Sequence, residues 1–210
     1  MKRIFSLVFL CLFLLTGCKK PEQADVAALP LPETEGIAPY KFSAQETALL
    51  RTFGVPVETH AQMLSFRAPE ETVTLHVNAY QLSEDKTAWI DREIEDVVIG
   101  AAETPHPLAG FLTTQVMADS SIRFHVNCGG ISSFRTDALL PAQPRFSVLT
   151  AGLHAPAAIT PDEEIPILFI AYTTEGKSVR FHTLEDVLDP SDLKDADYAQ
   201  LITLTFASKP

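Results

Sequence analysis

Residues 165–172 read Ile-Pro-Ile-Leu-Phe-Ile-Ala-Tyr, the most continuously apolar segment that follows the first 17 residues. Such a run is typical of a strand that is buried on both faces. Pro166, its one interruption, is expected at the entrance of the strand, where the ladder needs no donor. We therefore expect an opposing sheet over one face and a helix, a loop or a neighbouring chain over the other. Alternation assigns the two faces as Ile167, Phe169 and Ala171 on one side and Leu168, Ile170 and Tyr172 on the other.

Around this segment, much of the chain between Val55 and Phe181 carries apolar residues at every second position. The clearest sets are Val73, Leu75, Val77 and Ala79, and Ile122, Phe124 and Val126. A return strand is expected to begin at Val179 and Phe181. The remaining strands are expected over 72–79, around Trp89, and over 111–118, 121–127, 131–136, 145–150, 165–172 and 201–207.

Helical signals are few. The segment Ser43-Ala44-Gln45-Glu46 has the capping-box pattern and is followed by Leu49, Leu50 and Phe53, which predicts one short helix. Residues 184–197 break the two-residue period and are expected to contain helical turns around Pro190. About nine short strands against one or two short helices favour a mainly β fold, either an antiparallel β-sandwich or an open barrel.

The start of the chain has a different character. Lys2 and Arg3 precede an apolar run over 4–15, which ends in Leu15-Thr16-Gly17-Cys18. The run is too short to span a bilayer, and its flanks are typical of a secretory signal. The last four residues resemble the lipobox of bacterial lipoproteins. That resemblance implies cleavage between Gly17 and Cys18, a diacylglyceryl group on the Cys18 sulfur and an acylated amino terminus. The alternative is an ordinary signal peptide that a cysteine happens to follow.

These patterns predict a signal peptide over 1–17, a flexible membrane tether over 18–41 and a single β-rich globular domain over 42–210. The tether is predicted from its Pro, Ala and Glu content and from its lack of apolar period. By the sorting rules of the lipoprotein family, Lys19 lacks the Asp that commonly retains a lipoprotein at the inner membrane. The lipid-anchored protein is thus expected in the cell envelope, at the outer membrane of a two-membrane cell or otherwise at the outer face of the cell membrane.

The chain is acidic, with 27 Asp and Glu against 16 Lys and Arg and a net charge of −11. Removing Lys2 and Arg3 with the signal gives −11 − 2 = −13. This charge repels phosphate backbones, so nucleic acid is not an expected partner. The acyl chains then have to hold the protein at the membrane, and an unknown protein or small molecule remains as the ligand.

Cys128 is the candidate nucleophile that the sequence offers. Cys11 leaves with the signal and Cys18 is used by the anchor, so the mature domain has no internal disulfide. A cysteine enzyme needs a thiolate activated by an imidazole, and the residues around Cys128 match no protease signature. We interpret Cys128 as a small buried thiol.

Two metal hypotheses are also open. None of the six histidines (His60, His76, His106, His125, His154 and His182) lies in a zinc-binding spacing, but His76 and His125 would be neighbours if their strands paired. The acidic segment Glu185, Asp186, Asp189, Asp192, Asp195 and Asp197 invites a calcium interpretation, yet it fails the EF-hand spacing. A solvated acidic loop is the simpler account.

The sequence therefore identifies no catalytic residue, no metal ligand set and no cofactor; Cys18 is its one modification site. The leading hypothesis is a membrane-anchored envelope lipoprotein with a non-catalytic binding or structural β-domain. The alternatives are an envelope hydrolase with an undetected active site, which could use Cys128 or scattered carboxylates, and a periplasmic metal-binding protein.

Overall fold

The computed structural model describes residues 30–53, 61–92, 97–100, 108–128, 130–140, 146–174, 177–180 and 183–208, with the backbone alone over 97–100. The chain divides into two units, 1–30 and 31–210, and the description concerns the second. The predicted signal peptide and Cys18 lie outside the described residues.

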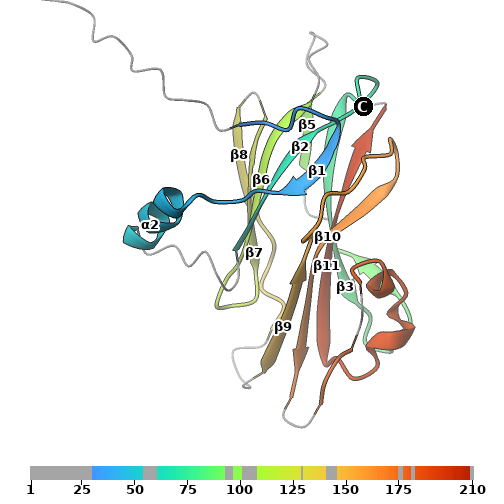
Figure 1. Ribbon diagram of the computed structural model, residues 1–210. Helices are drawn as coiled ribbons and strands as arrows, with labels where there is room; N and C mark the ends of the chain where they lie inside the picture. The colour runs from blue at the N-terminus through green and yellow to red at the C-terminus, as the bar shows by residue number, and fades with distance from the viewer. Residues whose placement is uncertain are drawn as a thin grey trace, which may run out of the picture. The chain divides into compact units, whose positions relative to one another are not determined.

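Eleven described strands form two antiparallel sheets (Figure 1). The five-stranded sheet has the order β1 (Gly36–Pro39), β2 (Ala61–Arg67), β6 (Ala109–Val116), β7 (Ile122–Asn127) and β8 (Ile131–Arg135). The six-stranded sheet has the order β4 (Trp89–Asp91), β3 (Thr74–Leu82), β11 (Tyr198–Ala207), β10 (Glu164–Thr173) and β9 (Ser147–Gly152), and β5 (Val97–Gly100) also pairs with β3. The prediction of an antiparallel β-sandwich is confirmed.

The main core lies between the two sheets. Each strand of the predicted alternating sets supplies its apolar face to this core, as the two-residue period requires. Phe66 of β2 and Phe206 of β11 meet across the sheets with ring centroids 5.4 Å apart. Val73 is the exception among the predicted inward residues, because it precedes β3 and is 38% exposed.

Strand β10 is buried on both faces, as predicted. Leu168, Ile170 and Tyr172 face the five-stranded sheet, whereas Phe169 and Ala171 belong to a second apolar cluster on the outer side. Ile167 was expected beside Phe169 but lies in the inner core, because the register shifts between Pro166 and Leu168. Pro166 lies ahead of Leu168, where pairing with β9 begins.

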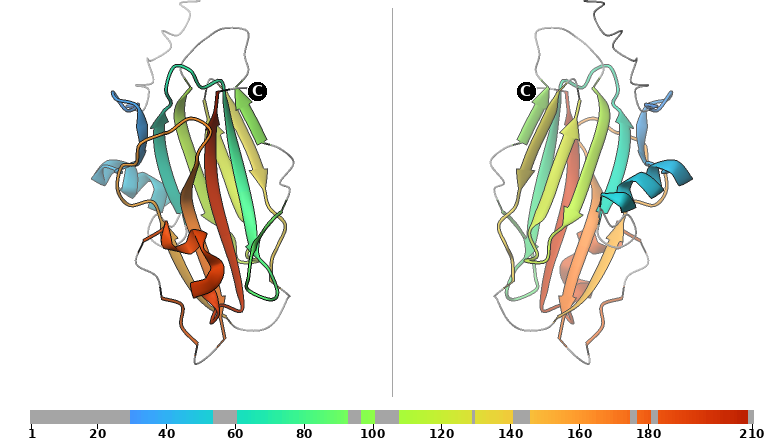
Figure 2. Two further views of the ribbon diagram at one scale, coloured as in Figure 1. Left: turned by 90° about the vertical axis from the view of Figure 1, so that its right-hand side faces the viewer. Right: turned by 90° about the vertical axis from the view of Figure 1, so that its left-hand side faces the viewer.

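The outer cluster is covered by the connection between β10 and β11. This connection contains two 3-10 helices, η1 (Asp186–Leu188) and η2 (Pro190–Leu193), which lie over the six-stranded sheet (Figure 2). Their buried residues Val187 and Leu193 pack on Phe169 and its neighbours. The helical turns around Pro190 are thus confirmed. The return strand predicted at Val179 is wrong, since residues 177–180 are irregular and β10 pairs with β11 instead.

Two further predictions concern the region before β2. Gly36–Pro39 falls in the predicted tether but forms β1, and Ile37 is only 1% exposed. The tether prediction is therefore wrong for this stretch: β1 pairs with β2, and the backbone of Ile37 exchanges two hydrogen bonds with Ala157. The predicted helix is confirmed as α2 (Ala44–Thr52) with its capping box, although none of its residues is buried.

We expect Phe169→Ala to lower the free energy of unfolding by about 3–5 kcal/mol, because the side chain is fully buried and its removal leaves a cavity. Urea unfolding of the soluble domain measures this loss. Ile90→Ala is the control, since Ile90 is 54% exposed and its change should stay within about 0.5 kcal/mol. A loss below about 1 kcal/mol for Phe169→Ala would contradict burial of the outer face of β10.

Candidate functional site

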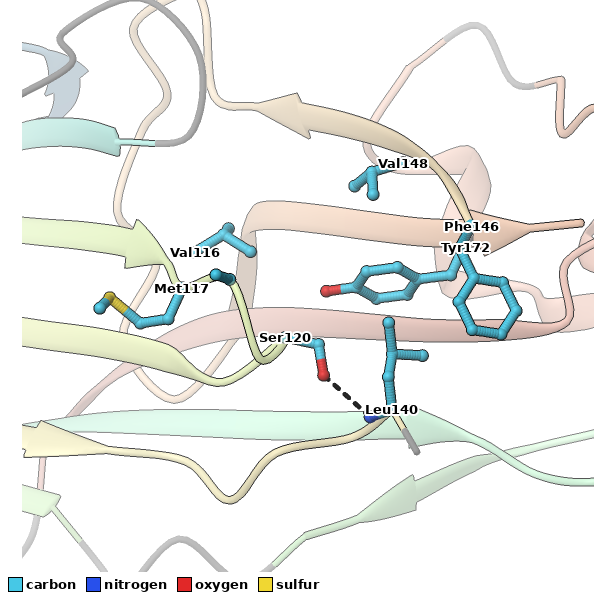
Figure 3. A pocket seen from close by; sticks show the side chains of 8 residues that line it. Val116, Met117, Ser120, Leu140, Phe146, Val148 and Tyr172 are labelled. Atoms are coloured by element: carbon cyan, nitrogen blue, oxygen red, sulfur yellow. Dashed lines mark hydrogen bonds between the residues drawn. The ribbon is translucent and has the colours of Figure 1, made fainter. Parts of the chain in front are cut away.

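A pocket of about 460 Å³ lies where β6 ends and β9 begins (Figure 3). Its walls come from three regions: the end of β6 with the turn that follows, the segment around Leu140, and the facing ends of β9 and β10. The volume falls within the range of small-molecule sites. The lining residues are Val116, Met117, Ala118, Ser120, Leu140, Phe146, Val148 and Tyr172.

The sheet register places the aromatic part of this wall. Tyr172 lies opposite Val148 in the β9–β10 pairing, so both side chains leave the same face of the six-stranded sheet. Phe146, just before β9, contacts Tyr172 edge-to-face, with ring centroids 6.5 Å apart, and Tyr198 in the same way at 5.6 Å. Tyr172 is only 2% exposed, whereas Val148 is 46% exposed. Tyr172 therefore forms the floor of the pocket and Val148 part of its rim.

Ser120 completes the opposite wall from the β6–β7 turn. Its φ of 65° is left-handed, which is uncommon for a residue with a side chain. The Ser120 hydroxyl donates to the carbonyl of Asp119 and accepts from the backbone N–H groups of Leu139 and Leu140, at 2.9 and 2.8 Å. These bonds hold the turn against the segment that carries Leu140 (Figure 3).

Gln200 of β11 connects the turn to the floor. Its Nε2 donates to the Ser120 carbonyl at 2.9 Å and to the Tyr172 hydroxyl oxygen at 3.3 Å. Gln200 is 1% exposed, so this amide is a buried polar group that needs such partners. Burial raises the pKa of Tyr172 to about 12, and the hydroxyl therefore stays protonated at neutral pH.

The wall of this pocket is mainly apolar. The eight described residues that line it include no charged side chain, and apolar groups make up most of this wall. The Ser120 hydroxyl is engaged with the backbone, which leaves the Tyr172 hydroxyl as the polar group on the floor. Apolar walls with a few placed polar groups are what small-ligand sites commonly present.

Sequence reasoning did not find this site, because its parts lie far apart in the chain. It left residues 119–120 between two expected strands and placed Tyr172 in a buried strand, both of which the structure confirms. One residue could have pointed to this region from the sequence. Gln200 is polar, yet it belongs to the alternating residues of β11 that face the core, and the others are apolar or aromatic (Tyr198, Ile202, Leu204 and Phe206).

A smaller cavity of about 270 Å³ lies on the outer side of the five-stranded sheet. Phe42 and Leu50 of the α2 region form one wall, and Met63, Thr113 and His125 lie among the residues of the other. Of the three apolar residues from which the helix was predicted, Leu50 lines this cavity, whereas Leu49 is 58% and Phe53 75% exposed.

Cys128 lies just after β7 and is partly buried. Burial raises the pKa of its thiol, and a hydrogen bond with the Ala109 backbone only partly opposes this. A nucleophilic cysteine needs a lowered pKa. The imidazole nearest in sequence, that of His125, bonds to the Ser133 hydroxyl at 2.7 Å.

The predicted histidine pair does not meet. His76 is on β3 and His125 on β7, which belong to opposite sheets, and the cores beside them place both side chains on outer faces. His76 bonds to the Thr74 hydroxyl at 3.1 Å. His154 bonds to the Gly152 carbonyl, and His60, His106 and His182 lie outside the described residues. Within the described ranges, no three His, Cys, Asp or Glu residues are placed to hold a metal ion.

Carboxylates of the acidic segment between Glu185 and Asp197 accept hydrogen bonds from backbone turns. The carboxylates of Asp186 and Asp189 accept from the N–H groups of Thr183 and Ser191, each at 2.9 Å. Asp197 accepts from the N–H of Thr174 and from Lys177, and these bonds lower its pKa to about 2. Carboxylates at such positions cap turns that would otherwise leave N–H groups unpaired.

No family model, curated protein or solved structure matches the chain. In the part that the structure describes, no helix has the length and hydropathy to cross a membrane.

We expect the Cys128 thiol to react with iodoacetamide more slowly in the folded protein than in urea at pH 7–8, because its raised pKa leaves little thiolate. A chain that starts at Lys19 has Cys128 as its single cysteine, so the label reports this residue alone. The rate should rise with pH beyond the point where the unfolded thiol has levelled off. Faster labelling in the folded state at pH 7 would indicate an activated thiolate and contradict the structural role.

Proposed function

We propose that the chain is a membrane-anchored lipoprotein of the cell envelope whose β-sandwich binds a small apolar molecule in the pocket of Tyr172, without catalysing its conversion. The anchor is supported by the lipobox-like residues 15–18 and by the secretory signal that precedes them. The observation that carries the binding role is a pocket of about 460 Å³ with apolar walls and one buried hydroxyl at its floor.

The size of the pocket is sufficient for useful affinity. A ligand that buries about 200 Å² of apolar surface gains on the order of 5 kcal/mol at about 25 cal/mol per Å². Part of this gain is lost to the translational and rotational freedom of the ligand. A preformed wall needs little ordering when the ligand binds, so little further free energy is lost. The contacts of Phe146 with Tyr172 and Tyr198 hold this wall in place.

Binding is favoured over hydrolysis by the groups that surround the pocket. Hydrolysis by covalent catalysis requires an activated nucleophile with a base in reach. The Ser120 hydroxyl donates to a backbone carbonyl, and Cys128 is not among the lining residues. The metal-binding alternative loses support because His76 and His125 lie on opposite sheets.

The anchor is tested by metabolic labelling of bacteria with an alkyne fatty acid. We expect the wild-type chain to carry the label and Cys18→Ser to lack it and to leave the membrane fraction. Cys11→Ser is the matched control, because Cys11 lies inside the predicted signal and should leave labelling unchanged. Equal label in Cys18→Ser and wild type would refute acylation at Cys18.

The pocket is tested with the fluorescent probe 2-(dimethylamino)-6-propylnaphthalene, a neutral and largely apolar molecule. We expect the soluble domain to bind it and Val148→Trp to weaken binding by at least about tenfold, because an indole at the rim fills space that the probe needs. Val148 is 46% exposed and lies on β9, an edge strand of the six-stranded sheet, so a larger side chain is compatible with folding.

Leu149→Trp is the matched control for this test. Leu149 is the next residue of β9 and faces the opposite side of the sheet, opposite Ala171 in the pairing. Its replacement should leave probe binding unchanged. Absence of binding to the wild type, or equal loss in both variants, would overturn the proposed site.

A further inference from the structure

The orientation of the Gln200 amide is fixed by its neighbour. The carbonyl oxygen of Ser120 can only accept a hydrogen bond, so the amide atom that lies 2.9 Å from it has to be the nitrogen. A flipped amide would set two oxygens against each other at this distance. The same nitrogen is 3.3 Å from the Tyr172 hydroxyl oxygen and therefore donates to it as well.

This arrangement fixes the role of the Tyr172 hydroxyl. A phenol oxygen that accepts from an amide still has one hydrogen to donate. Among the described residues, the contact with Gln200 is the one hydrogen bond of this hydroxyl, and in it the hydroxyl accepts. In Figure 3 the hydroxyl points away from Phe146, toward the side of the pocket where Val116 and Ser120 lie. Tyr172 thus presents a hydroxyl hydrogen without a described acceptor, from a residue that is only 2% exposed.

The other polar group of the wall does not offer the same contact. The Ser120 hydroxyl already donates to Asp119 and accepts from two backbone N–H groups. The other described side chains of the lining are apolar, so the described wall offers a ligand one hydrogen-bond donor in an apolar surface. Because a buried donor without an acceptor is costly, a ligand that brings an acceptor oxygen to this point is favoured.

The charges around the pocket narrow the class of ligand further. None of the described residues that line the pocket is cationic, and the nearby carboxylate of Asp119 already pairs with Arg135. A carboxylate or phosphate on the ligand would lose its hydration without gaining a counter-charge. A neutral acceptor avoids this loss.

We propose that the pocket binds a neutral apolar molecule that carries a carbonyl oxygen, and that this oxygen accepts a hydrogen bond from the Tyr172 hydroxyl. The inference rests on the proposed function and specifies its ligand. The geometry assigns Tyr172 as the residue that distinguishes a carbonyl compound from a hydrocarbon of the same shape, while the apolar wall contributes to the binding of both.

The test compares two probes of nearly equal shape. One is 6-propionyl-2-(dimethylamino)naphthalene, which has a ketone, and the other is its propyl analogue without the oxygen. We expect the wild-type protein to bind the ketone about three- to tenfold more tightly, the range for one net hydrogen bond. Tyr172→Phe should remove this preference while still binding the propyl probe. We expect the variant to fold, because Gln200 keeps its bond to the Ser120 carbonyl and the ring keeps its contact with Phe146.

A second measurement needs no variant. The carbonyl stretch of the ketone probe bound to the wild-type protein should lie at lower frequency than in an aprotic solvent, as a hydrogen bond from a hydroxyl requires. An unshifted stretch, or a ketone preference that survives Tyr172→Phe, would overturn the carbonyl inference and leave the binding pocket standing. Failure of both probes to bind the wild type would overturn the pocket and the inference together.

Discussion

Strand β10 cannot be stable in a single layer, and the arrangement of the domain follows from this constraint. Nine of its ten residues are buried, so water has to be excluded from both of its faces. Fully burying side chains of the size of Phe169 or Ile170 contributes roughly 1.5–3 kcal/mol each, which would be lost if either face were left open. The five-stranded sheet covers one face, and the η1–η2 segment covers the other.

The outer cover also determines how β10 is connected to β11. The segment that covers β10 is its own connection to β11, and a tight hairpin at this position would leave Phe169 and Ala171 exposed. The connection has to be long, and its polar groups need partners. Asp197 supplies some of them: its N–H bonds to the Tyr172 carbonyl and its carboxylate to the N–H of Thr174. Trp89 adds a bond from its indole N–H to the Val187 carbonyl.

Features encoded in neighbouring residues could be predicted from the sequence, and features set by distant contacts could not. The alternation of Ile122, Phe124 and Val126 is local and gave the correct inward face. The bulge that moves Ile167 inward depends on the register with β11, and β1 depends on pairing with β2 and on the Ala157 backbone. The pocket is assembled from residues as far apart as Val116 and Tyr172, so no spacing along the chain could reveal it.

Gln200 and Tyr172 both place polar atoms in a region where apolar side chains would suffice, but the fold depends on them differently. Ser120 has a left-handed backbone, and its carbonyl is satisfied by the Gln200 amide, so Gln200 supports the turn. The ring of Tyr172 packs on Phe146, which a phenylalanine would do equally well. Its hydroxyl oxygen accepts the second N–H of the Gln200 amide, but the hydrogen of the hydroxyl has no acceptor among the described residues, and burying such a donor costs free energy. A buried donor without a described acceptor, at the floor of an apolar pocket, is the feature of this domain for which ligand recognition gives a physical reason.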